Sequence, residues 1–289
     1  MIICIVGPTA VGKTKLSIEL AKKYKAIVVN CDSTQVYKGM NVGTAKVTEE
    51  EKEGIPHYLF DIVDPDYNYT VYDYQQDARK IIEENKGRNI ILVGGTGLYL
   101  KAALYNYEFS EETNENQEYN ELSNEELYAL ALKKDSNMNI HQNNRKRLIR
   151  FLNKENIKQA ECYPIYDAIY IGLTTDRKTL YDRINERADI MFKSRLLEEV
   201  KEFHDKKVDS KAINTAIGYK ELYKYFSHEI SLEEAIDLVK KNSRHYAKRQ
   251  YTWFKNQMDI DWLEVDFNNF DNTINKAIEL IEQKTNENK

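Results

Sequence analysis

The chain has 289 residues, of which 42% are hydrophobic and 31% are charged, and its five histidines and three cysteines are scattered. This composition predicts a soluble, cytoplasmic protein without a membrane span or a structural zinc site. The net charge of −5 argues against a general nucleic-acid coat, but basic residues concentrate within 145–150 and 240–255, where a local polyanion groove is possible.

The first motif lies at the N-terminus, where an apolar run at 1–6 predicts a strand and the spacing at 15–23 predicts a helix. Between them stands the phosphate-binding loop G-x-x-x-x-G-K-[ST], formed by Gly7, Pro8, Thr9, Ala10, Val11, Gly12, Lys13 and Thr14. Such a loop aims backbone N–H groups at an anion. Lys13 adds a positive charge and Thr14 a hydroxyl for Mg²⁺, so the expected ligand is a phosphorylated compound.

Strands and helices alternate through the next hundred residues. We expect strands at 26–29, 57–63 and 89–93 and a helix at 71–85. This alternation predicts an α/β fold, a P-loop NTPase-like parallel sheet flanked by helices. Ligands of such sheets bind at the carboxyl ends of the strands, where the loop, Asp32 and the glycine run 94–97 all fall.

The polar, nearly glycine-free segment that follows has a different character. We expect a small all-helical insertion at 106–139, with a helix at 124–134, between two parts of a catalytic core at 1–105 and 140–289. A disordered surface segment is the alternative. The later elements are expected as a basic helix at 143–153, a strand at 168–173, helices at 177–203 and 232–257, a strand at 260–267 and a helix at 274–283.

Asp32 is the most informative carboxylate, because it follows the second strand beside the loop and precedes Ser33, Thr34 and Gln35. A carboxylate that faced a bound phosphate would be repelled by it. Asp32 is therefore expected to face an acceptor, where it could take a hydrogen bond or a proton from an amine. The alternative is a turn residue whose carboxylate bonds to nearby backbone.

Nucleoside triphosphate hydrolysis would require an apolar strand that ends in a metal-binding Asp. The strand expected at 89–93 runs into glycines instead, and Asp61 is a substitute that does not stand at a strand end. The hydrolase hypothesis is weakened but stays open. The glycine run at 94–97 would let backbone come close to a ligand.

Two basic stretches could contact an anion. Arg147 and Arg150 are three residues apart on one helix face, where they could clamp a diphosphate or form an ordinary charged surface. Segment 244–255 interleaves basic with aromatic residues, as RNA contact requires. The alternative is an amphipathic helix whose large aromatic side chains pack in the core, namely Tyr246, Trp253 and Phe254.

Taken together, these stretches resemble the bacterial tRNA dimethylallyltransferases, also called tRNA isopentenylpyrophosphate transferases. The resemblance covers roughly residues 1–265 in family order. It rests on Gly7–Thr14, Asp32–Tyr37, Gly43–Lys46, Asp61–Pro65, Gly94–Tyr99, Asn143–Asn144 with Arg147 and Arg150, Ile217–Glu221, and Tyr246–Gln250 with Thr252–Phe254.

The resemblance implies transfer of a dimethylallyl group from dimethylallyl diphosphate to the N6 amine of the adenine 3′ of the anticodon in tRNA, with Mg²⁺ as cofactor. It implies catalytic roles for Asp32, Lys13, Thr14 and Arg150, diphosphate binding by Gly7 to Thr14, and a contact of Thr14 with Mg²⁺. The tRNA-binding residues that it implies are Asp32, Ser33, Thr34, Gln35, Thr96, Arg147, Arg150, Lys248 and Arg249. The insertion would contact the anticodon stem-loop, and we expect a monomer.

Three other functions share some of these features. A prenyltransferase acting on free adenine nucleotides would also need the loop and Asp32, but neither the insertion nor the basic aromatic segment. A small-molecule kinase would use the loop for ATP. An RNA-binding, ATP-dependent switch would form no bond to the RNA.

Overall fold

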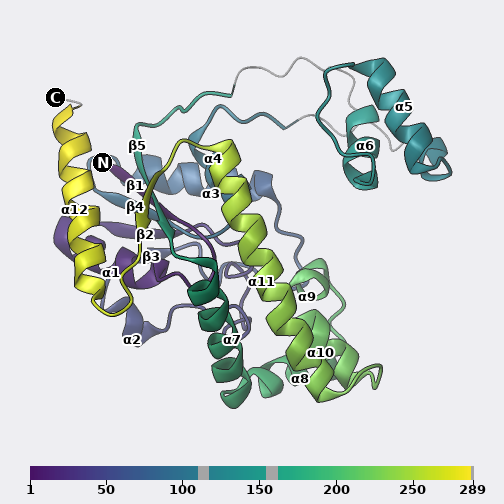
Figure 1. Cartoon of the computed structure of the whole chain (residues 1–289). Helices are drawn as coiled ribbons and strands as arrows, with labels where there is room; N and C mark the ends of the chain where they lie inside the picture. Colours follow the sequence, from purple (N-terminus) through teal and green to yellow (C-terminus); the bar gives the residue numbers. More distant parts are fainter. Residues whose placement is uncertain (110–116, 154–161, 288–289) are drawn as a thin grey trace. The chain divides into compact units, whose positions relative to one another are not determined.

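The computed structural model describes residues 1–109, 117–153 and 162–287, and these form two compact units (Figure 1). The first unit comprises Met1–Tyr105 and Pro164–Lys289, and the second comprises Asn106–Tyr163. The second unit therefore extends beyond residue 139 and takes in the basic helix that the sequence placed in the core. Residues 110–116 of the expected insertion lie outside the described residues.

Within the described residues of the first unit, six strands form one sheet in the order β3-β2-β4-β1-β5-β6. Every neighbouring pair is parallel, which confirms the predicted fold class. The strands are β1 (Ile2–Val6), β2 (Ile27–Asn30), β3 (His57–Tyr58), β4 (Ile90–Val93), β5 (Ala168–Thr174) and β6 (Asp261–Glu264). The central strand β1 is apolar throughout because helices cover both faces of the sheet.

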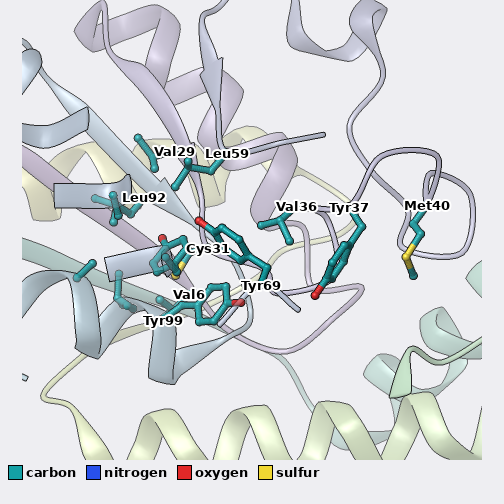
Figure 2. Close-up of a cluster of buried hydrophobic side chains, with 14 of the residues drawn as sticks. Val6, Val29, Cys31, Val36, Tyr37, Met40, Leu59, Tyr69, Leu92 and Tyr99 are labelled. Carbon is teal, nitrogen blue, oxygen red and sulfur yellow. The ribbon is translucent and has the colours of Figure 1, made fainter. Parts of the chain in front are cut away.

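Alternate side chains of β1 enter different hydrophobic cores. Cys4 belongs to a cluster with α3 (Val71–Glu84) and α4 (Gly97–Leu104), and Figure 2 shows part of this cluster. Ile3 belongs to a cluster on the opposite face with α1 (Lys13–Tyr24) and α12 (Phe270–Glu287). This alternation is the period of two that a strand imposes, and α1 and α12 lie side by side in Figure 1.

The remaining helices of the first unit are α2 (Glu49–Lys52), α7 (Arg177–Lys193), α8 (Leu196–Asp205), α9 (Lys211–Thr215), α10 (Tyr219–Phe226) and α11 (Leu232–Gln257). Helices α7 and α11 pack against each other. Arg244 donates to Asn185 at 2.6 Å, and Lys240 pairs with Asp189 at 2.5 Å. In these two pairs the residue number falls along α11 as it rises along α7, so the two helices are antiparallel.

Several expected elements differ from those observed: the strand expected at 260–267 is shorter, the helix expected at 274–283 is longer, and two others change as follows. The helix expected at 177–203 is divided into α7 and α8, because Ser194 has φ −85° and ψ −138° and leaves the helical region. The strand expected at 57–63 stops after Tyr58, because Leu59 and Asp61 have φ of +63° and +53°. Such left-handed residues do not fit an extended strand.

The second unit has a small core of its own around Leu127 and Leu148. Its described elements are a 3₁₀ turn at Gln117–Asn120, α5 (Asn124–Lys134) and α6 (Arg145–Leu152). The helix predicted at 124–134 is confirmed, and Ser123 caps its first turn. Arg145 at the start of α6 donates to the carbonyl of Leu122 at 2.6 Å and so joins α6 to the turn before α5. Throughout the described helices of both units, none is long and apolar enough to cross a bilayer.

Candidate functional site

The phosphate-binding loop connects β1 to α1, as the sequence predicted. Gly12 has φ +102° and caps α1, a backbone conformation that favours glycine, and Val11 is buried in the core beneath the loop. The Lys13 ammonium lies across the loop and donates to the carbonyls of Gly7 at 3.0 Å and Pro8 at 2.7 Å. The pKa of Lys13 is lowered to about 8, mainly because the ammonium is buried; Asp32 opposes this shift and nearby Arg187 adds to it.

Two helices distant in sequence hold the loop. From α7, Arg183 donates to the carbonyl of Ala10 at 3.1 Å and Arg187 donates to the Thr9 hydroxyl at 3.3 Å. From α11, the buried Gln250 accepts the Thr9 N–H at 2.9 Å and donates to the carbonyl of Gly95 at 3.1 Å. Sequence reasoning gave Arg183 and Arg187 no role. Their only local signal was a spacing of four residues, which places them on one helix face.

Asp32 uses one carboxylate oxygen as a turn residue. Oδ1 accepts the N–H of Thr34 at 3.0 Å and its hydroxyl at 2.7 Å, as the turn alternative predicted. Asn30 fixes the backbone from the other side by accepting the Asp32 N–H at 2.9 Å. The other oxygen, Oδ2, has no hydrogen-bond partner among the residues that the structure describes. The turn therefore orients the carboxylate and leaves Oδ2 available as a proton acceptor.

Ser33 and Thr96 meet across the carboxyl ends of β2 and β4. The Thr96 hydroxyl accepts the Ser33 N–H at 3.0 Å and donates to the Ser33 hydroxyl at 3.2 Å. The adjacent glycines do not serve the role that their sequence suggested. A Cβ at Gly95 would overlap Gln250, and one at Gly97 would overlap Trp253. These glycines allow close packing inside the protein rather than the approach of a ligand.

A cavity of about 300 Å³ opens between these elements. The polar residues that line it are Thr9, Asp32, Ser33, Thr34, Thr44, Arg187, Thr215, Lys220, Ser243, Tyr246 and Arg249. The other lining residues are Ala10, Gly43, Ile184, Ala188, Met191, Ala216, Ile217 and Val239. Carboxylate, guanidinium and hydroxyl groups thus share one cavity with an apolar surface, as a site for an amphipathic ligand requires.

The other predicted site residues lie in three settings. Gln35 donates to the carbonyl of Thr44 at 3.0 Å and so braces a loop that lines the cavity. Lys248 is exposed on α11, next to Arg249. Arg147 and Arg150 are exposed on α6 in the second unit.

The aromatic residues of α11 favour the packing alternative over direct stacking on RNA. Phe254 is buried with 1% of its surface exposed, and Trp253 packs against the same core. Tyr246 instead lines the cavity, where burial raises the pKa of its hydroxyl. Segment 244–255 therefore exposes Lys248, Arg249 and Lys255, while Trp253 and Phe254 pack into the protein.

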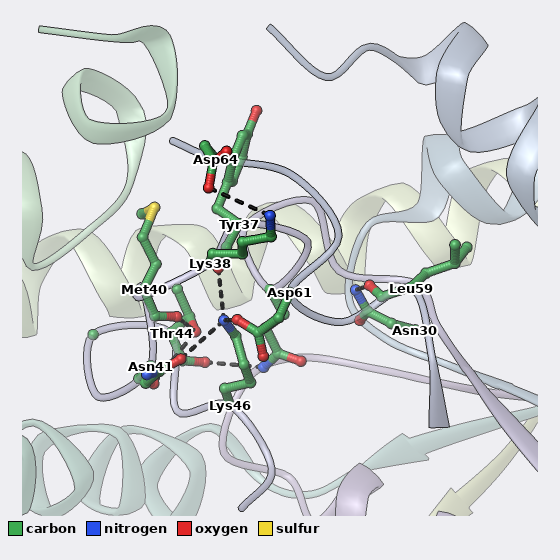
Figure 3. Close-up of polar contacts among 12 residues, drawn as sticks. Asn30, Tyr37, Lys38, Met40, Asn41, Thr44, Lys46, Leu59, Asp61 and Asp64 are labelled. Atoms are coloured by element: carbon green, nitrogen blue, oxygen red, sulfur yellow. Dashed lines mark hydrogen bonds and ion pairs between the residues drawn. The ribbon is translucent and has the colours of Figure 1, made fainter. Parts of the chain in front are cut away.

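Asp61 is unsuited to the metal-binding role that it was considered for. Its carboxylate accepts a hydrogen bond from the Lys46 ammonium at 2.5 Å. That ammonium also donates to the carbonyl of Tyr37 at 2.7 Å and to the side-chain oxygen of Asn41 at 3.0 Å (Figure 3). The Lys46 side chain is only 4% exposed, whereas that of Asp61 is 44% exposed, so the pair ties two loops together at the edge of the protein. Removing Asp61 would leave the buried Lys46 ammonium without its anionic partner.

Mg²⁺ is compatible with the loop. The described residues contain no group of three acidic, histidine or cysteine side chains that could hold a metal ion. Mg²⁺ bound with phosphates needs few protein ligands, because water and phosphate oxygens complete its coordination. The exposed Thr14 at the start of α1 fits that requirement.

Glu199 holds the loop that forms one side of the cavity. Its carboxylate accepts three successive backbone N–H groups, from Asn41 at 3.0 Å, Val42 at 2.8 Å and Gly43 at 3.0 Å. The Tyr219 hydroxyl donates to the same carboxylate at 2.5 Å. One side chain of α8 thus satisfies four donors.

We expect Glu199→Gln to lower the free energy of unfolding by about 1–3 kcal/mol, because an amide replaces one accepting oxygen and turns an N–H group toward the loop donors. Urea unfolding measures this loss. Glu198→Gln is the matched control, because its exposed side chain pairs only with Arg195 in the described part of the chain. Equal midpoints for the two variants would show that the Glu199 contacts do not stabilise the loop.

The parallel sheet, the loop after its central strand and the carboxylate after its neighbour define a P-loop-type α/β protein. The model of the IPP transferase family matches residues 35–257. The chain belongs to this family and is a transferase, as the sequence resemblance implied.

Named relatives match nearly the whole chain. The tRNA dimethylallyltransferase of Bacillus subtilis (strain 168) is 45% identical, covering 91% of this chain and 90% of its own length. The tRNA dimethylallyltransferase of Anoxybacillus flavithermus is 43% identical, covering 98% of this chain and 96% of its own length.

Solved structures agree with this assignment. The full-length tRNA isopentenylpyrophosphate transferase from Bacillus halodurans has a TM-score of 0.76 at 40% identity, covering 99% of this chain and 98% of its own. A eukaryotic dimethylallyltransferase described as acting on tRNA has a TM-score of 0.83 at 27% identity, covering 100% and 80%.

Proposed function

We propose that this protein transfers a dimethylallyl group from dimethylallyl diphosphate to the N6 amine of the adenine 3′ of the anticodon in tRNA, in the cytoplasm. The product would be N6-isopentenyladenosine, with release of diphosphate. The observation that carries the proposal is a single cavity lined both by Thr9 of the phosphate-binding loop and by Asp32, whose Oδ2 can take a proton. We propose that the enzyme is a monomer.

The loop and two cations would bind the leaving group. When the bond between C1 of the donor and the diphosphate oxygen breaks, its electron pair stays on the diphosphate. Lys13 and Arg187 lie beside the loop and offset that developing charge. Mg²⁺, held by Thr14 and the diphosphate oxygens, would supply further positive charge.

Asp32 would act on the acceptor. The lone pair of the adenine N6 forms the new bond to C1, and N6 must then lose one proton. Oδ2 of Asp32 takes this proton, while Thr34 holds Oδ1 and fixes the direction of the carboxylate. Positioning both substrates in one cavity lowers the barrier further, because a weak amine is held in line with C1.

Exposed basic residues would bind the RNA around the target adenine. Lys248 and Arg249 are exposed basic residues of α11, and Arg249 also lines the cavity. In the second unit, Arg147 and Arg150 lie exposed on α6. We propose that these residues bind tRNA phosphates and that the second unit contacts the anticodon stem-loop.

Comparing two acceptors tests the proposal. With labelled dimethylallyl diphosphate and Mg²⁺, we expect an anticodon stem-loop carrying the target adenine to become labelled and AMP to remain unlabelled. Matched stem-loops with guanine at that position serve as controls, because they lack the N6 amine. Labelling of AMP at the rate of the stem-loop would favour a free-nucleotide prenyltransferase instead.

A further inference from the structure

We propose that Met191 limits the length of the prenyl group, so that the cavity accepts a five-carbon donor and excludes a ten-carbon one. This inference rests on the proposed function, which places the diphosphate at the loop. Met191 would be a specificity-determining residue, because it lines the cavity one helical turn beyond Arg187, which contacts the loop.

Helix α7 gives the cavity a direction. It lines the cavity with Ile184, Arg187, Ala188 and Met191, whose spacing of three and four residues places them on one face. Arg187 donates to Thr9 and therefore marks the end nearest the loop. Met191 lies four residues further on, which is about 6 Å along the helix axis.

Helix α11 forms the facing wall. The contacts of Arg244 with Asn185 and of Lys240 with Asp189 define its antiparallel register. In that register Val239, which is buried and lines the cavity, stands at the level of the last turn of α7, opposite Met191. The same end therefore receives an apolar side chain from each helix.

The segment between α9 and α10 also lines the cavity. It contributes Ala216, which is buried, and Ile217. Lys220 also lines the cavity, but its ammonium lies 3.7 Å from the carboxylate of Glu221 and is neutralised there. The exposed Thr215 adds one hydroxyl. A hydrocarbon chain that starts at Arg187 thus meets a mainly apolar surface.

The dimensions favour the shorter donor. A dimethylallyl chain spans three carbon–carbon bonds from C1 to its end, about 4 Å for bonds of about 1.5 Å, and a ten-carbon chain spans seven, about 9 Å. The rise of about 6 Å along α7 from Arg187 to Met191 exceeds the length of the first chain and falls short of the second.

A competition between two donors tests the role of Met191. Wild type, Met191→Ala and the matched control Ile190→Ala each receive equal amounts of the five-carbon and ten-carbon allylic diphosphates with an anticodon stem-loop. Mass spectrometry then gives the ratio of the two RNA products. Ile190 is a suitable control because its side chain is 57% exposed and does not line the cavity.

We expect wild type and Ile190→Ala to favour the five-carbon product by about 100-fold or more, because several added carbons must be rejected. Met191→Ala should shift the ratio at least tenfold toward the ten-carbon product. Val239→Ala, on the facing helix, should shift it in the same direction and gives a second, independent variant.

Two failures are distinguishable. Unchanged product ratios in both cavity variants, with five-carbon transfer intact, would overturn the limit set by Met191 and leave the proposed function standing. If the wild type transferred neither donor, the proposed function would fail and this inference with it.

Discussion

Asp32→Asn is expected to lower kcat by about 10²–10⁴-fold, the usual contribution of a positioned general base. The asparagine oxygen can still accept the N–H and hydroxyl of Thr34, so the turn that orients the side chain is kept. The substitution replaces Oδ2 by an amide nitrogen, which cannot take a proton from the adenine amine. Affinity for RNA and for the donor should therefore change little.

Single-turnover rates at saturating substrates, combined with separate measurements of RNA and donor binding, separate the two effects. Asp64→Asn is a matched control, because Asp64 is an exposed carboxylate that pairs with Lys38 at 3.5 Å. If Asp32→Asn lost affinity for RNA as strongly as it lost rate, Asp32 would be a binding residue and not the proton acceptor.

Lys13→Met is expected to lower kcat/KM for the donor by about 10²–10³-fold, because a preorganised cation at the leaving group is lost. The wild type adds a pH signature. Since the pKa of Lys13 is lowered to about 8, the amine is charged below that pH and neutral above it. We therefore expect kcat/KM for the donor to fall as pH rises through about 8.

Bound diphosphate favours the charged amine, so the corresponding fall in kcat should appear at higher pH. Profiles of kcat/KM and of kcat from neutral to alkaline pH measure both decreases. Lys13→Met should lack the fall near pH 8, whereas Lys15→Ala, which removes an exposed lysine stacked on Phe270, should keep it. If kcat/KM of Lys13→Met still fell near pH 8, the fall would come from another group and not from Lys13.

Much of the sheet could be predicted because its strands are short, apolar and followed by recognisable loops. The run at 1–6 and the motif after it fixed the first strand, the loop and α1 together. Helix α11 was predicted with its observed bounds, since Ser231 and Glu234 form a capping box at its start. Local chemistry decided these elements, and local chemistry is visible in a sequence.

Other features depend on contacts between distant residues. Helix α4 was not anticipated, because Gly97 resembles a loop residue until Trp253 is placed against it. The end of the second unit at Tyr163 follows from the packing of α6 on α5, not from a change in composition. Neither contact could be predicted from the spacing of residues in the sequence.

The candidate site was predictable in part for the same reason. Asp32, Ser33 and Thr34 stand next to a strand and could be found. The turn alternative for Asp32 is observed at Oδ1, and the proton-acceptor role of Asp32 stays a prediction. Arg187 and Met191 approach the loop and the cavity only through the fold of α7. Their side chains carry no motif that would have singled them out.

The transfer itself is tested most directly by nucleoside mass analysis of unmodified tRNA incubated with the protein, dimethylallyl diphosphate and Mg²⁺. We expect the adenine 3′ of the anticodon to gain one dimethylallyl group in place of an N6 proton, and every other adenine to stay unchanged. An unmodified target adenine after incubation, or a dimethylallyl group on another atom, would contradict the proposed function.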